Sequence, residues 1–274
     1  MKFIPAVVPL LVGIIVPTAV HAQEEAPSSA VTVSGSATIT SDYRFRGVSQ
    51  SDEDMAVQGG LSISHAGGLY AGVWASNLAG WGTFGGSNME LDLIGGYKAA
   101  LDENAVLDVG LTWYMYPGGA SDTDFAEPYV KLSGTSGPAT FTAGVAYAPK
   151  QYALANVSNA PNSRGQKQDN LYTWGDGAFV IAGTPLTAKA HVGHSDGNPG
   201  LGPNGTSVAP TGSYWDWSVG LDAAWRNLTF NISYMDTDIT RSQAARLQPS
   251  FSKGQDGTGS IADAAVVASL TAAF

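Results

Sequence analysis

Apolar and polar residues alternate along most of the chain with a period of two, and no long segment shows the helical period of 3.6. In residues 31–46 the odd positions carry Val31, Val33 and Ile39, whereas the even positions stay polar up to Arg46. Successive side chains of a strand point to opposite faces, so the alternation predicts strands with one apolar and one polar face. The same test predicts twelve strands, at residues 31–46, 55–64, 69–77, 88–98, 105–116, 125–133, 139–148, 170–182, 185–194, 213–225, 227–237 and 262–274.

Most of these segments have about ten residues, the length that a strand tilted by about 45° needs to cross the hydrocarbon of a bilayer. The links between them alternate between short ones, such as residues 183–184, and long ones, such as residues 149–169. An even number of strands with this alternation is typical of bacterial outer-membrane barrels. We therefore predict an all-β fold, a single closed antiparallel transmembrane β-barrel with short periplasmic turns and long extracellular loops.

The two ends of the chain carry features of exported proteins. Lys2, an apolar stretch over residues 3–16 and small residues before Gln23 predict a signal peptide over residues 1–22 that is cleaved after Ala22. Residues 23–274 then form the barrel domain in the outer membrane, surrounded by its lipid. The last strand ends at Phe274 and resembles the C-terminal strand that the barrel assembly machinery reads in outer-membrane proteins.

Composition excludes several classes of function. Charged residues make up 13% of the chain, against about 25% in ordinary soluble domains. The formal net charge is −10, and a stripe of basic residues is missing, which argues against nucleic acid as a partner. Without cysteine the chain has neither disulfides nor thiolate metal sites. We expect no cofactor and no metal.

Aromatic residues gather where the predicted strands cross the two surfaces of a membrane, as in outer-membrane barrels. We expect two exposed girdles of such residues. The girdle toward the long loops comprises Trp113, Tyr116, Tyr147, Trp174, Trp215 and Tyr234, and the girdle toward the short turns comprises Tyr70, Tyr97, Phe141, Trp225 and Phe274.

The polar faces predict the lining of a pore. Continued alternation of the first strand sends Tyr43 and Phe45 outward, and it places Arg44 and Arg46 in the lumen near its mouth, where we expect them to meet Glu90, Asp92, Glu127 or Asp216 and narrow the opening. The predicted lining residues are Asp42, Arg44, Arg46, Glu90, Asp92, Lys98, Asp108, Glu127, Lys131, Lys189, Asp216 and Asp222, together with Asp176. Carboxylates outnumber basic groups in this set, which predicts a weak preference for cations.

One stretch resembles a known family. The sequence SDYRFRG at residues 41–47, followed by GVWASN at 72–77 and ELDL at 90–93, is similar to the start of the TorF porin family. This resemblance covers about the first third of the mature chain and implies a β-barrel pore. We therefore expect a porin-like channel for passive diffusion of small hydrophilic solutes, and no enzyme.

Three alternatives stay open. A soluble β-sandwich also has alternating strands, although its loops need not alternate in length. An outer-membrane lipid hydrolase would use His194, Ser195 and Asp196, but adjacent residues of a strand point to opposite faces. His191 and His194 are three residues apart and therefore also lie on opposite faces of a strand, which argues against a shared metal. The third alternative is a non-conducting structural or adhesion barrel whose lumen is filled.

Overall fold

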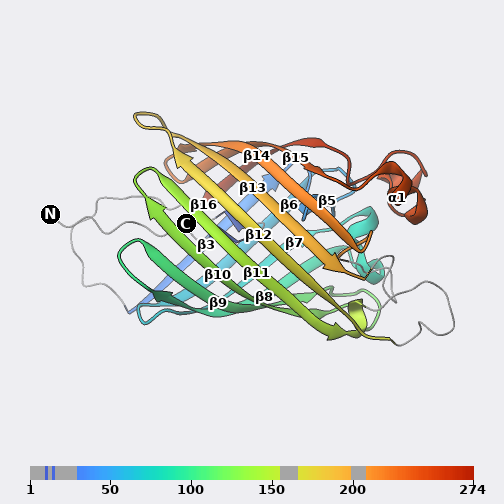
Figure 1. Cartoon of the computed structure of the whole chain (residues 1–274), viewed down its shortest axis with the longest axis horizontal. Helices are drawn as coiled ribbons and strands as arrows, with labels where there is room; N and C mark the ends of the chain where they lie inside the picture. The colour runs from blue at the N-terminus through green and yellow to red at the C-terminus, as the bar shows by residue number, and fades with distance from the viewer. Residues whose placement is uncertain (1–9, 12–13, 16–29, 155–165, 199–207) are drawn as a thin grey trace.

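A closed antiparallel barrel of twelve strands forms the body of the molecule (Figure 1). The computed structural model describes residues 10–11, 14–15, 30–154, 166–198 and 208–274. The closed barrel of twelve strands confirms the predicted fold and strand number. The barrel strands are β3 (Val31–Thr40), β6 (Ala56–His65), β7 (Leu69–Asn77), β8 (Met89–Ala100), β9 (Ala105–Met115), β10 (Phe125–Ser136), β11 (Ala139–Gln151), β12 (Gln168–Val180), β13 (Leu186–Gly197), β14 (Ser213–Trp225), β15 (Leu228–Thr237) and β16 (Ala265–Ala273).

The first and last strands of the barrel close it. In the register of β16 with β3, Ser269 lies opposite Thr40 and Ala273 opposite Ser36. Phe274 continues this pairing, because its backbone N–H donates to the carbonyl oxygen of Gly35 and its own carbonyl accepts from the Gly35 N–H. Closure pairs the first barrel strand with the last, so the barrel sheet has no edge strand.

The barrel has an inverted distribution of polarity. Large apolar side chains such as Val33, Phe230 and Leu270 are exposed on the outer face, at 60%, 47% and 46%. Charged and polar side chains such as Lys131 and Glu127 are buried on the inner face. A soluble core shows the opposite arrangement, whereas an apolar exterior fits a barrel surrounded by hydrocarbon.

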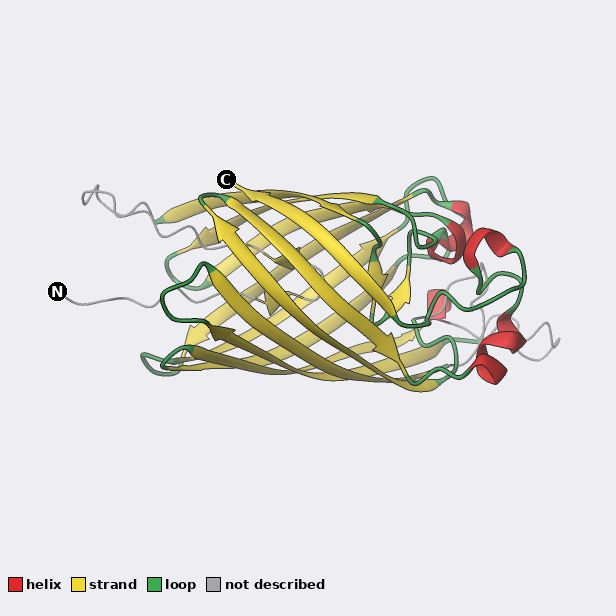
Figure 2. Ribbon diagram, turned by 90° about the horizontal axis from the view of Figure 1, so that it is seen from above, coloured by secondary structure: helices red, strands yellow, loops and turns green. Residues whose placement is uncertain are grey.

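Turns and loops are segregated to opposite ends of the barrel (Figure 2). The short turns share one end with the C-terminus, and the long loops lie at the other end with the helices of the described residues. These helices are η1 (Gly80–Gly82), η2 (Phe84–Gly86), η3 (Tyr152–Leu154), α1 (Arg241–Ala244), η4 (Ala245–Leu247) and η5 (Lys253–Gln255). Among the described residues, none of these helices has the length and apolar composition needed to cross a membrane.

The predicted signal peptide lies almost wholly outside the described residues. Of residues 1–22, the structure describes only β1 (Leu10–Leu11) and β2 (Ile14–Ile15), which pair with each other. Its cleavage therefore stays a prediction.

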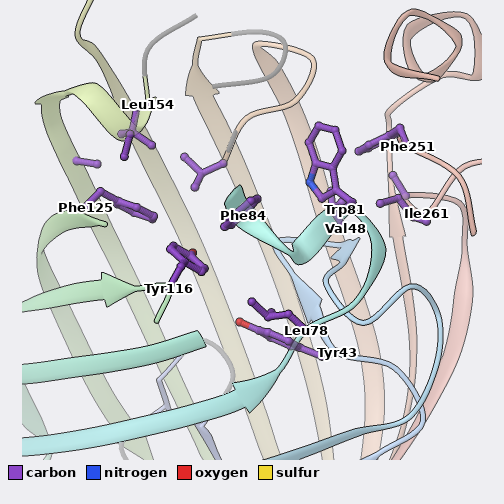
Figure 3. Close-up of a cluster of buried hydrophobic side chains, with 14 of the residues drawn as sticks. Tyr43, Val48, Leu78, Trp81, Phe84, Tyr116, Phe125, Leu154, Phe251 and Ile261 are labelled. Atoms are coloured by element: carbon purple, nitrogen blue, oxygen red, sulfur yellow. The ribbon is translucent and has the colours of Figure 1, made fainter. Parts of the chain in front are cut away.

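The long loops pack together over the mouth of the barrel through a set of buried apolar residues, which we call the mouth cluster (Figure 3). Trp81 meets Phe251 edge-on at 4.8 Å between ring centroids, and Phe84 meets Tyr116 at 4.7 Å. The members labelled in Figure 3 are Tyr43, Val48, Leu78, Trp81, Phe84, Tyr116, Phe125, Leu154, Phe251 and Ile261.

Two exposed groups of aromatic residues are present, but three of the predicted members are wrong. Tyr116 lies in the mouth cluster, while Trp174 and Tyr70 turn into the barrel, where the Tyr70 hydroxyl donates to Asp108 at 2.7 Å. These rings find polar or aromatic partners inside, which a single strand does not reveal. The remaining members are exposed as predicted: Trp113, Tyr147, Trp215 and Tyr234 near the long loops, and Tyr97, Phe141, Trp225 and Phe274 near the short turns.

Candidate functional site: the inserted segment and the barrel interior

The first barrel strand ends at Thr40, six residues earlier than the alternation predicts. Residues 41–55, the inserted segment, leave the wall of the barrel, and the part that contains Tyr43 and Arg46 enters the mouth. Within it β4 (Arg44–Phe45) pairs with β5 (Val48–Ser49), and the turn between them places Arg46 and Gly47 at positive φ.

Asp42 holds the start of this segment in its turned conformation. Its carboxylate accepts from the Ser49 hydroxyl at 2.6 Å, from Ser51 at 3.2 Å and from Arg44 Nε at 2.7 Å. Local side-chain hydrogen bonds of this kind compete with the sheet ladder for the backbone. β3 therefore ends just before Asp42, whose carboxylate accepts hydrogen bonds from residues that follow it in the chain.

The predicted outward orientation of Tyr43 and Phe45 is wrong for the same reason. Tyr43 is buried, meets Trp74 edge-on at 5.4 Å and donates its hydroxyl to Glu90 at 2.9 Å. Phe45 packs edge-on against Tyr114 at 5.9 Å between centroids. Once the chain leaves the sheet, the period of two no longer determines which side a residue faces.

Arg46 connects the inserted segment to the opposite wall. Its Nη2 donates to both carboxylate oxygens of Glu127 on β10, each at 2.7 Å. The guanidinium lies 4.0 Å above the ring of Tyr172 on β12 and 4.6 Å from that of Phe45. The Tyr214 hydroxyl on β14 donates to the Arg46 carbonyl at 3.0 Å. The segment thus reaches across the barrel from β3 to β10, β12 and β14.

Arg44 stays among residues of the loops. Besides Asp42, its Nη1 donates to the carbonyl oxygens of Gly47 at 3.0 Å and Asp263 at 2.7 Å, and its Nη2 lies 3.5 Å from Glu53. None of the four carboxylates expected for it is among these partners. Of the two arginines, Arg46 alone has one of those expected carboxylates as an ion-pair partner.

The inserted segment separates two internal cavities. The polar cavity, of about 210 Å³, lies among β3 and β12–β16 and is lined by Asp176, Lys189 and His191. The aromatic cavity, of about 60 Å³, lies toward β7–β12 and is lined by Asp92 together with aromatic rings. Tyr43, Arg46 and Tyr172 line both.

Charged pairs connect neighbouring strands along the inner wall. Lys131 Nζ lies 3.2 Å from Asp108, and Lys189 Nζ lies 3.3 Å from Asp222. His191 lies between Asp176 at 2.6 Å and Asp216 at 3.1 Å. Because each nitrogen faces a carboxylate, an imidazolium with two N–H groups satisfies both.

The predicted lining residues differ in how accessible they are. Lys98, Lys189 and Asp222 are partly accessible on the inner wall, and Lys98 Nζ lies 5.0 Å above the ring of Tyr70. The others are buried, in the inserted segment or on the wall: Asp42, Arg44, Arg46, Glu90, Asp92, Asp108, Glu127, Lys131, Asp176 and Asp216.

Inward aromatic rings were missed by the alternation, although glycines in the sequence mark their places. Trp174 lies opposite Gly144 in the register of β12 with β11, and a Cβ at Gly144 would overlap the indole. A Cβ at Gly193 would likewise overlap the hydroxyl of Tyr172. Glycine in a strand often marks such a close approach, but the ring that approaches comes from another strand.

The residues of the hydrolase alternative do not form a catalytic pair. His194 and Ser195 both lie in β13, so their side chains point to opposite faces, and Ser195 is buried. His194 Nε2 lies 3.0 Å from the hydroxyl of Ser213, and its ring packs on Trp215. Among the described residues, no group of His, Asp and Glu has the arrangement of a metal site.

The fold defines a class, the closed antiparallel β-barrels with an apolar exterior, and solved structures share it. The NanC porin in a rhombohedral crystal form aligns with a TM-score of 0.55 and 13% identity, covering 89% of this chain and 99% of that chain. The KdgM porin in complex with disordered oligogalacturonate aligns with a TM-score of 0.52 and 7% identity, again over 89% and 99%. At these identities the likeness concerns the fold.

The family is defined by sequence. The chain belongs to the Gcw_chp family, described as bacterial proteins of unknown function, and the match spans residues 24–274. A comparison with curated proteins gave no match.

Proposed function

We propose that the protein is an outer-membrane channel of the porin class, through which small hydrophilic solutes diffuse passively. The observation that carries this proposal is a closed barrel with an apolar exterior and an interior that holds ion pairs and cavities. Such an interior is suited to water and polar solutes. The aligned structures are porins, which supports a channel over an enzyme, and the TorF resemblance of residues 41–97 agrees with it.

Export and assembly belong to the same proposal. Residues 1–22 direct the chain across the inner membrane, and residues 23–274 fold in the outer membrane. The barrel assembly machinery recognises the last strand through Phe274, whose side chain is 75% exposed beside the barrel seam. The long loops then face the cell exterior, and the short turns face the periplasm.

The lining favours a modest preference for cations. Eight carboxylates and five Lys or Arg side chains occupy the predicted lining, and His191 adds a further basic group between Asp176 and Asp216. With His191 as an imidazolium, eight negative groups face six positive groups, so the excess of negative charge is small. Salt screens such an excess, and the preference therefore weakens at high ionic strength.

A filled barrel is the second candidate, because the mouth is covered in this structure. The inserted segment crosses the lumen, and the mouth cluster packs the long loops above it. If the inserted segment and the loops keep this arrangement, the protein is a structural or adhesion barrel that conducts no ions.

Planar-bilayer recording with purified protein separates the two candidates. A gel in which the folded band shifts on heating shows first that the barrel is folded. We expect discrete conductance steps and, under a KCl gradient, a reversal potential of the sign for K⁺ preference that shrinks as both salt concentrations rise. Clear anion preference would reject the charge argument, and folded protein without conductance would favour the filled barrel.

A further inference from the structure

Three charged residues lie side by side on the inner wall, in a row across β8, β9 and β10. Lys98 lies opposite Asp108 in the register of β8 with β9, and Asp108 lies opposite Lys131 in the register of β9 with β10. All three belong to the predicted lining of the pore. The row therefore holds two basic groups for one carboxylate.

The contacts of Asp108 decide which of the two bases is left over. Its Oδ2 lies 3.2 Å from Lys131 Nζ, and its Oδ1 accepts from the Tyr70 hydroxyl at 2.7 Å. Tyr70 reaches this position because its opposite residue on β8 is Gly96, where a Cβ would overlap the phenol hydroxyl. Both oxygens of the carboxylate thus have a partner other than Lys98.

Lys98 makes neither an ion pair nor a side-chain hydrogen bond in the part of the chain that the structure describes. Its Nζ lies 5.0 Å above the ring of Tyr70, a favourable contact that does not neutralise the charge. The other basic groups of the lining each lie within 3.3 Å of a carboxylate oxygen, namely Arg44, Arg46, Lys131, Lys189 and His191. Within the described lining, Lys98 is therefore the one basic group without a carboxylate partner.

Water reaches this part of the wall from the short-turn end of the barrel. Lys98 is partly accessible, and Thr32 and Ser64, which lie on the inward side of β3 and β6 near the same end, are exposed. An unpaired charge beside an aqueous path attracts ions of the opposite sign and repels ions of its own. The fields of two opposite charges in contact largely cancel farther away. Lys98 thus acts on passing ions more strongly than a paired base does.

We propose that Lys98 is a specificity-determining residue of the channel, the basic residue that keeps its preference for cations weak. The inference deepens the proposed function and rests on it, because selectivity requires a conducting pore. Eight negative groups of the lining face six positive groups when His191 is counted as an imidazolium. Without Lys98 they face five, so the excess of negative charge rises from 8 − 6 = 2 to 8 − 5 = 3.

Reversal potentials under a KCl gradient, compared for four side chains at position 98, test this role. Lys98→Gln removes the charge, Lys98→Glu reverses it, and Lys98→Arg keeps it. We expect the ratio of K⁺ to Cl⁻ permeability to rise by at least about twofold in Lys98→Gln and further in Lys98→Glu. The conservative variant Lys98→Arg should keep the ratio of the parent protein. These differences should shrink at about 1 M KCl, where the Debye length is about 3 Å.

Arg226→Gln provides the matched control. Arg226 follows β14 in a short turn at the same end of the barrel, and its guanidinium lies 5.0 Å from the ring of Trp225, which is 64% exposed on the outer face. The substitution removes the same charge outside the lumen, so the reversal potential should stay that of the parent protein. The band shift on heating shows for each variant that the barrel is folded.

The outcomes separate this inference from the channel itself. Folded Lys98→Gln or Lys98→Glu that conducts with the parent's reversal potential would overturn the role of Lys98 and retain the channel, and either variant suffices if the other does not fold. An equal change in Arg226→Gln, or a change in Lys98→Arg as large as that in Lys98→Gln, would overturn it as well. Folded parent protein without conductance would reject the channel and this role together.

Discussion

We predict that Arg46→Gln releases the inserted segment from the wall of the barrel. Arg46 Nη2 donates to both oxygens of Glu127, and the two side chains are only 3% and 4% exposed. Glutamine keeps a polar side chain, is shorter than arginine and removes the charge. The substitution therefore removes the ion pair together with the contact between the guanidinium and the ring of Tyr172.

The magnitude follows from burial and distance. Unit charges about 4 Å apart attract by about 4 kcal/mol at an effective dielectric constant of about 20, and loss of one partner of a buried pair costs about 3 to 5 kcal/mol. Loss of the contact between the guanidinium and the ring of Tyr172, 4.0 Å from its centroid, adds about 0.5 to 2 kcal/mol. The Gln side chain and hydration of the released Glu127 recover part of this sum.

We take about 3 kcal/mol as the net change in favour of the released segment. Each 1.4 kcal/mol is about tenfold, so the ratio of seated to released segment falls roughly 150-fold. Single-channel recording measures this as a rise in open fraction, or in conductance if the seated segment leaves a narrow path. Glu127→Gln should act in the same direction, and the double variant should lose much less than the two single changes together.

A surface ion pair provides the matched control. Lys253 and Asp54 are 2.9 Å apart, but their side chains are 51% and 68% exposed, so Lys253→Gln should leave the recordings nearly unchanged. If folded Arg46→Gln has the conductance and open fraction of the parent protein, Arg46 does not hold the constriction and the reasoning is refuted.

Two further predictions concern the wall and its topology. Gly144→Ala places a Cβ into the ring of Trp174, and overpacking of this kind should destabilise the barrel by about 1 to 3 kcal/mol, measured by urea unfolding in vesicles. Gly134→Ala, where a Cβ meets nothing within 4 Å, should be neutral or slightly stabilising, and equal effects of the two changes would contradict the packing argument. Because the sequence has no cysteine, Ser242→Cys should react with an impermeant maleimide on whole cells and Glu103→Cys should not. Labelling of Glu103→Cys but not of Ser242→Cys would show that the short turns, not the long loops, face the cell exterior.

The sequence by itself determined the wall of the barrel. The alternation of residues such as Phe230, Ile232 and Asn231 is local, because backbone geometry alone sends successive side chains to opposite faces. Because hydrocarbon lies outside the barrel and polar partners lie inside it, the apolar residues of a strand face outward and the polar residues face inward along its whole length. The segment predicted at residues 170–182, which has Tyr172 and Asp176 on one face, is a strand of 13 residues, β12.

Only the tertiary structure determined where residues 41–55 lie and which residues they contact. The hydrogen bonds that Asp42 accepts from the residues after it are local and turn the chain. The position of Arg46, however, depends on Glu127, which is 81 residues away in sequence. The mouth cluster likewise joins Trp81 to Phe251 across most of the chain. The period of two is set by neighbouring peptide units and ends with the strand, whereas these contacts depend on which strands closure brings to the same mouth.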